Sequence, residues 1–83
     1  MTLDDLAELN PEALTADGFE DAILGVTVNH HHPVVVVYDY RRCVEILVSQ
    51  GLSHEEAEEY LSFNTLGAYV GQNGPLYMER IEK

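Results

Sequence analysis

The sequence predicts an α+β fold: a small antiparallel sheet of about three strands packed against two helices, plus a short N-terminal helical segment. The run 34–38 is apolar and β-branched, which is typical of a buried strand. Segments 40–50 and 53–65 carry apolar residues at helical spacing. A C-terminal run, 76–81, follows a turn and is expected to complete the sheet.

The chain is short enough for one small domain, and its first residues differ from the rest. We expect residues 1–17 to form an N-terminal helical appendage and residues 18–83 to form a single α+β domain. Acidic residues and regularly spaced leucines predict a helix over residues 2–9. The apolar face of this helix needs cover, for which a second copy of the chain is one candidate.

The first strand is expected at residues 22–28, where Gly25 indicates a bulge or a close approach of another backbone. A loop of about five residues separates it from 34–38, so an antiparallel hairpin is the default arrangement. Residues 34–37 do not alternate between apolar and polar, which predicts burial on both faces and a central position. The strand at 76–81 would then be the second neighbour.

Both helices have recognisable capping residues. Asp39 follows the central strand and is expected to be the N-cap of the first helix. Gly51 suits the left-handed residue that ends it in a Schellman arrangement. Ser53 and Glu56 have the spacing of a capping box at the start of the second helix.

Charge excludes several classes of function. The formal net charge is −11, from 15 Asp and Glu against 4 Lys and Arg. Direct binding to nucleic-acid phosphates or to an anionic membrane needs clustered cations, so we expect neither. A single cysteine and an acidic N-terminus without a signal-peptide pattern favour the cytoplasm. The small core favours a homo-oligomer, and we expect no cofactor.

The histidines and the cysteine are weak candidates for chemistry. His30, His31 and His32 could bind a metal with His54, but adjacent side chains in an extended loop point in alternating directions. A solvated loop is the simpler interpretation, and we predict no metal site. Cys43 lies on the apolar stripe of the first helix, which predicts a buried and unreactive thiol.

A second set of residues could form a ligand pocket or a subunit interface. Asn64 lies among apolar neighbours and must find hydrogen-bond partners, while Gly67 permits a close approach. The alternative is structural: Asn64 caps a helix end, Asp39 caps the first helix, and the arginines pair with carboxylates inside the chain or across an interface. The candidate binding or interface residues are Asp39, Arg41, Arg42, Asn64, Gly67 and Tyr69.

The second predicted helix also carries a dense acidic face. Its carboxylates could be a solvated surface, could contact a basic protein, or could imitate the phosphates of DNA. Asp4, Asp5, Glu8 and Glu12 would extend that row if the N-terminal segment packs nearby. The acidic face consists of Glu55, Glu56, Glu58 and Glu59.

Several blocks of the sequence resemble, in the same order, a family of small uncharacterised proteins encoded by phages and prophages. The blocks are 19–25 (FEDAILG), 37–47 (VYDYRRCVEIL), 55–60 (EEAEEY) and 63–71 (FNTLGAYVG). The resemblance covers about residues 19–75, and the histidine loop is not part of the pattern. It implies a viral accessory protein that acts inside a bacterial host.

The function that we expect is therefore a small acidic phage accessory protein that binds and modulates a host component without catalysing a reaction. Its partner would be a host protein or a second copy of the chain. One alternative is an acidic DNA mimic that inhibits a nucleic-acid-binding protein. Another is a protein that sequesters a small molecule in a pocket at a subunit interface.

Overall fold

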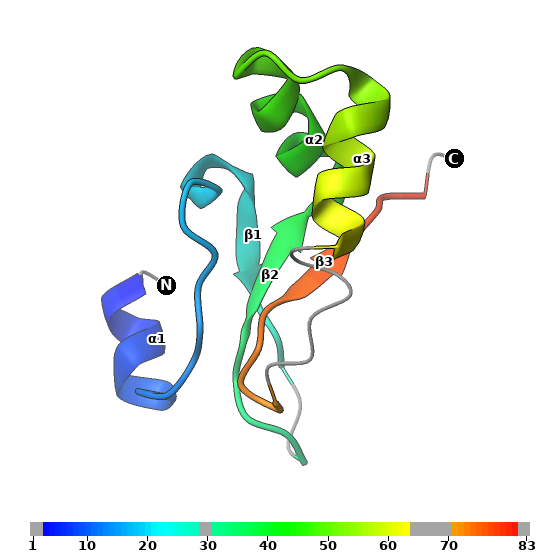
Figure 1. The fold of residues 1–83 in the computed structure, drawn as a ribbon. Helices are drawn as coiled ribbons and strands as arrows, with labels where there is room; N and C mark the ends of the chain where they lie inside the picture. Colours follow the sequence, from blue (N-terminus) through cyan, green and yellow to red (C-terminus); the bar gives the residue numbers. More distant parts are fainter. Residues whose placement is uncertain (1–2, 29–30, 64–70, 82–83) are drawn as a thin grey trace.

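The computed structural model describes residues 3–28, 31–63 and 71–81, and it confirms the α+β class (Figure 1). A three-stranded sheet lies beside a short N-terminal helix, and two further helices follow the central strand (Figure 1). The elements are α1 (Leu3–Leu9), the 3₁₀ helix η1 (Glu20–Ala22), β1 (Ile23–Val26), β2 (Val36–Asp39), α2 (Tyr40–Ser49), α3 (His54–Leu61) and β3 (Leu76–Met78).

The sheet has the order β1-β2-β3, with β2 in the centre as predicted. β1 and β2 form the expected antiparallel pair, and the register shifts between Ile23 and Gly25, where the glycine predicted an irregularity. β2 and β3 are parallel, with Tyr38 opposite Tyr77, so the sheet is mixed and the prediction of an antiparallel sheet was wrong for this pair. A parallel pair requires a crossover, and α2 and α3 lie within that connection.

The central strand is less completely buried than its sequence predicted. Val35 and Val36 are buried, whereas Val34 and Val37 are only half-buried. Tyr38 is 1% exposed and its ring stacks on Tyr77, with 5.5 Å between the ring centroids. One face of β2 therefore contributes most of the strand's buried surface.

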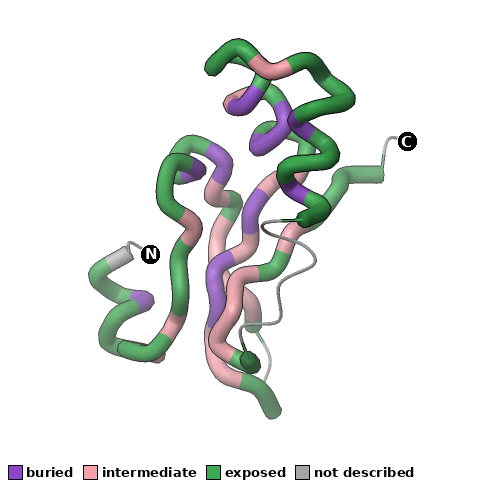
Figure 2. Tube along the Cα trace, in the orientation of Figure 1, coloured by how far each residue is buried: buried purple, intermediate pink, exposed green. Residues whose placement is uncertain are grey.

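α2 continues beyond the carboxyl end of β2, and α3 turns back toward the sheet, where its buried Ala57 and Leu61 share a cluster with Tyr38 (Figure 1). β2 runs directly into α2 without a loop, so the helix continues past the strand. Buried residues gather where β2 meets these helices (Figure 2). The main cluster consists of Leu6, Phe19, Ala22, Val36, Tyr38, Cys43, Val44, Leu47, Ala57 and Leu61.

The predicted capping residues are confirmed. The Asp39 carboxylate accepts a hydrogen bond from the Arg42 amide, as an N-cap does. Gly51 has a φ of +109° and follows the end of α2. Ser53 and Glu56 form the capping box of α3, and a π-helical turn continues the helix over residues 62 and 63. Residues 64 and 65 lie outside the described part of the chain.

The N-terminal segment docks on its own chain. Leu6 is buried in the main cluster. The Asn10 side-chain amide donates to the carbonyl of Val34 at 2.9 Å and to the side chain of Asn73 at 3.0 Å. The Ala16 amide donates to the Tyr38 hydroxyl at 2.8 Å. These contacts join residues 6–16 to the central strand and to the turn before β3.

Candidate functional site

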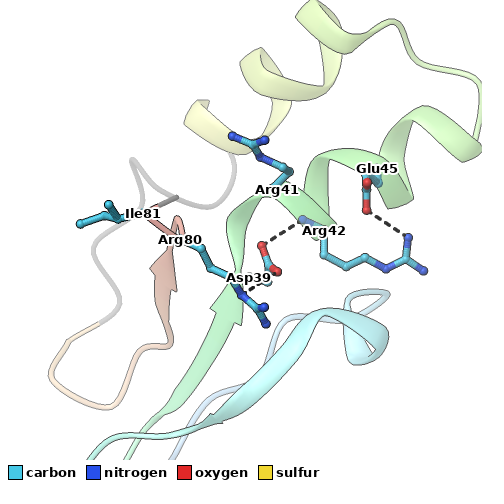
Figure 3. A pocket seen from close by; sticks show the side chains of 6 residues that line it. All are labelled: Asp39, Arg41, Arg42, Glu45, Arg80 and Ile81. Carbon is cyan, nitrogen blue, oxygen red and sulfur yellow. Dashed lines mark hydrogen bonds and ion pairs between the residues drawn. The ribbon is translucent and has the colours of Figure 1, made fainter. Parts of the chain in front are cut away.

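The parallel pairing of β2 and β3 brings their carboxyl ends to the same edge of the sheet, where α2 begins. A hollow of about 390 Å³ lies at this edge (Figure 3). Ligands of open α/β sheets commonly bind outside the carboxyl ends of the strands, so this edge is a reasonable place to look for a site. The hollow is lined by Asp39, Arg41, Arg42, Glu45, Arg80 and Ile81.

Asp39 lines the hollow and has two roles. Its Oδ1 atom accepts a hydrogen bond from the Arg42 amide at 3.2 Å, which caps α2. Its Oδ2 atom lies 3.8 Å from Nε of Arg80, a residue just beyond β3 (Figure 3). The carboxylate therefore joins the start of the helix to the segment that follows the third strand.

The arginines pair with carboxylates of the same chain, as the structural alternative predicted. Arg42 lies 3.4 Å from Glu45 one turn along α2, and Arg41 lies 2.9 Å from Glu79. Figure 3 shows the Arg41 guanidinium pointing away from Asp39. Arg41 also lines a neighbouring hollow of about 290 Å³, together with Tyr40, Val44, His54, Glu58 and Glu79.

The predicted interface set is only partly described. The hollow brings together Asp39, Arg41 and Arg42, whereas Asn64, Gly67 and Tyr69 lie outside the described residues. Sequence reasoning missed the contributions of Glu45, Arg80 and Ile81. The spacing of Glu45 three residues after Arg42 was a local signal for an ion pair on one helix face. Nothing local points to Arg80, because its position depends on the direction of β3.

The acidic face of α3 is exposed throughout, and one of its members has a structural role. The Glu56 carboxylate accepts a hydrogen bond from the Ser53 amide at 2.9 Å. The hydrogen bonds from the backbone and side chain of Ser53 lower the pKa of Glu56. Glu58 pairs with His54 at 3.3 Å. Glu55 and Glu59 complete the exposed face.

Exposed apolar side chains lie beside these carboxylates. Phe63, just after α3, is 83% exposed, and Tyr60 is also exposed. The carboxylates of the N-terminal segment do not join this surface, because α1 and α3 lie at opposite sides of the molecule (Figure 1). The acidic row that would extend from α3 to residues 4–12 is therefore not formed.

Cys43 is buried as predicted. Burial, and secondly the charge of Asp39, raise the pKa of its thiol to about 11. The thiol is therefore protonated near neutral pH, which leaves little thiolate for nucleophilic chemistry.

The histidines are not brought together as one ligand set. His31 and His32 are exposed, and His30 lies outside the described residues. The described segment that leads into β2 lies at the end of the sheet away from α3, the helix that His54 begins (Figure 1). Within residues 3–28, 31–63 and 71–81, no group of at least three His, Cys, Asp or Glu side chains is placed to hold a metal ion.

Comparison with protein families, with curated proteins and with solved structures finds no match to this chain. Its class therefore follows from its own fold and surface: a small α+β protein with an acidic helix and an arginine-lined hollow. Of the helices in the described residues, none has the length and apolar character to cross a membrane.

Proposed function

We propose that this protein is a small acidic accessory protein, encoded by a phage, that binds and modulates a component of its bacterial host without catalysis. The resemblance of residues 19–75 to phage and prophage proteins supports the origin and a location in the host cytoplasm. The net charge of −11 favours a partner with a basic surface. The host component is therefore proposed to be a basic protein.

The observation that carries this proposal is the exposed surface of α3. Glu55 and Glu59 lie four residues apart on the helix and are both exposed. Phe63 lies four residues further on and is 83% exposed. Protein interfaces commonly combine a desolvated aromatic side chain with a polar rim. The carboxylates would attract the partner, and Phe63 would anchor it.

DNA mimicry is one form of this interaction and needs carboxylates spaced along an extended surface. The helix α1 lies away from α3 (Figure 1), so a mimic would rely on α3 and its immediate neighbours. The structure favours a local contact with a basic protein over a long row of phosphate-like charges.

A pull-down from lysate of the bacterial host tests the proposal, with the immobilised protein at low and at physiological salt. We expect wild type to retain a specific protein, and retention to fall as salt screens the charges. The double variant Glu55→Gln/Glu59→Gln and the variant Phe63→Ala should each retain at least about tenfold less, a loss of about 1.4 kcal/mol or more.

The matched control is Glu8→Gln/Glu12→Gln, which removes the same number of charges from exposed positions at the other side of the molecule. It should retain the partner nearly as well as wild type. Equal losses in both double variants would show that net charge, and not the surface of α3, is responsible. A retained nucleic-acid-binding protein that free DNA displaces would favour mimicry.

Self-association belongs to the same proposal, most simply as a symmetric homodimer. Leu76 and Met78 on the edge strand β3 and Leu9 on α1 are exposed apolar side chains that a second copy could cover. Light scattering at tens of micromolar should give about twice the monomer mass of 9.3 kDa. A mass near that of the monomer would contradict the dimer and leave the host-protein proposal intact.

A further inference from the structure

We propose that the hollow at the carboxyl ends of β2 and β3 binds the oxyanion of a small molecule, a phosphate or a carboxylate, between the guanidinium groups of Arg42 and Arg80. This site is separate from the exposed surface of α3. It would give the protein a ligand in addition to its proposed protein partner.

The first argument is the placement of positive charge. The chain has only 4 Lys and Arg against 15 Asp and Glu, yet Arg41, Arg42 and Arg80 all line one hollow. Asp39 and Glu45 are the carboxylates of that lining. A chain this acidic could neutralise scattered carboxylates with scattered arginines, so the placement of Arg42 and Arg80, which come from different parts of the chain, along one hollow needs a reason. Guanidinium groups recognise carboxylates and phosphates through paired N–H donors.

The second argument is that the existing partners are easily replaced. Arg80 lies 3.8 Å from Asp39, which is beyond hydrogen-bond distance, and Arg42 lies 3.4 Å from Glu45. Both arginine side chains are about half exposed or more, and ion pairs of this kind contribute little to stability. Each guanidinium has several N–H donors, so an oxyanion can bind without unfolding any element.

Overall repulsion does not prevent this binding. At physiological ionic strength the Debye length is about 8 Å, so carboxylates on the far side of the molecule are largely screened from the hollow. The charges that matter are those at its walls. The N-terminus of α2 opens on the same edge, and its helix dipole adds a favourable partial charge. Of the two carboxylates that line the hollow, Asp39 also caps α2, whereas Glu45 only competes with a ligand for the arginines.

The size and remaining wall of the hollow indicate a small ligand. Its volume of about 390 Å³ is at the lower end of the range of about 300–1,000 Å³ that is typical of small-molecule sites. Ile81 supplies an apolar wall and is 88% exposed. A compact molecule with an oxyanion at one end and an apolar body would fit both features.

NMR titration tests the proposal, with inorganic phosphate and with acetate as separate probes and with ionic strength held constant by chloride. We expect saturable shifts of the backbone amides of residues 39–45 and 80–81, with a dissociation constant on the order of millimolar. Saturation by phosphate alone would assign the site to phosphates. Saturation by acetate as well would assign it to the shared oxyanion geometry.

Three variants should change the affinity for phosphate in opposite directions. Arg42→Gln and Arg80→Gln should each weaken phosphate binding about tenfold, because each removes a charge-assisted contact. Glu45→Gln should strengthen it about three- to fivefold, because a competing negative charge leaves the wall. The control Glu8→Gln removes an equal charge from exposed α1 and should change affinity less than twofold.

The proposal is overturned if neither probe gives saturable shifts in wild type, or if Glu45→Gln and Glu8→Gln change affinity equally. Circular dichroism identifies a variant that has failed to fold. If both arginine variants fail to fold, the comparison of phosphate affinity between Glu45→Gln and Glu8→Gln still tests the proposal. Because α3 is unchanged in these variants, their result is independent of the host-protein experiment.

Discussion

The helical hairpin and the N-terminal segment are held by opposite kinds of contact. In the hairpin α2–α3, the bonds that end and begin the helices join neighbours in sequence, such as Asp39 with Arg42 and Ser53 with Glu56. The segment at residues 10–16 is held by bonds that span 22 to 63 residues, from Ala16 to Tyr38 and from Asn10 to Asn73. The hairpin can be specified locally, whereas the segment requires a nearly complete fold.

The largest effect should come from Tyr38 of β2, which shares the buried cluster with residues of both regions. Tyr38 is 1% exposed, stacks on Tyr77 and accepts a hydrogen bond from Ala16. Tyr38→Ala should lower the free energy of unfolding by about 4 kcal/mol, since it removes a fully buried ring and a long-range hydrogen bond. Urea denaturation measures the loss.

Tyr38→Phe is the matched control for this prediction. It keeps the ring and removes only the hydroxyl that Ala16 contacts, so it should cost about 1 kcal/mol. An equal loss in the two variants would mean that the hydrogen bond to the N-terminal segment outweighs the packing of the ring.

Asn10 tests the long-range region alone. Its side-chain amide donates to Val34 and Asn73, and its Oδ1 atom accepts from the amide of Glu12. Asn10→Ala should cost about 2 kcal/mol, because several partly buried groups lose their partners. Hydrogen exchange should accelerate at the amides of Ala13, Leu14 and Ala16 while the amides of α2 and α3 change little.

Asn10→Asp keeps the size of the side chain and the acceptor for Glu12 but removes the donor. It also turns a negative charge toward the oxygens of Val34 and Asn73, so it should cost at least as much as Asn10→Ala if the donor bonds matter most. Acceleration of exchange throughout α2 and α3 would show that the two regions unfold together, and would contradict the distinction drawn between them.

The same contrast explains how much the sequence could predict. The capping residues Asp39, Gly51 and Ser53 act within a few residues, and each was identified correctly from its neighbours. The direction of β3 depends on where the crossover returns, so a short apolar run gave no sign of it. The sequence predicted only some of the residues that line the hollow, for the same reason. Arg80 reaches Asp39 because β3 runs parallel to β2.

A smaller effect is expected within the hairpin at Gly51. Its φ of +109° is a conformation that side chains with a Cβ rarely adopt. Gly51→Ala should cost about 1 kcal/mol by straining the end of α2, although the space around it is open. Thermal or urea denaturation measures the change.

Gly25→Ala is the control, because Gly25 also has open space for a Cβ but has no positive φ. It should be neutral within about 0.5 kcal/mol. If both substitutions cost the same, the backbone conformation at Gly51 is not what makes a glycine necessary there.

The smallest expected effect is the pH dependence of the capping box. Hydrogen bonds from the backbone and side chain of Ser53 lower the pKa of Glu56 below its ordinary value of 4.5. Stability from the ionised carboxylate is therefore fully present above about pH 4.5 and is lost as pH falls through the lower pKa of the folded state. Glu56→Gln should be less stable than wild type at neutral pH, and the two proteins should converge in acid.

Glu59→Gln is the control for this prediction. It removes the same charge from α3 without touching the capping box, so its difference from wild type reports the loss of an exposed charge alone. If the free energies of unfolding of wild type and Glu56→Gln stay parallel down to about pH 3, the ionised Glu56 carboxylate does not stabilise the start of α3.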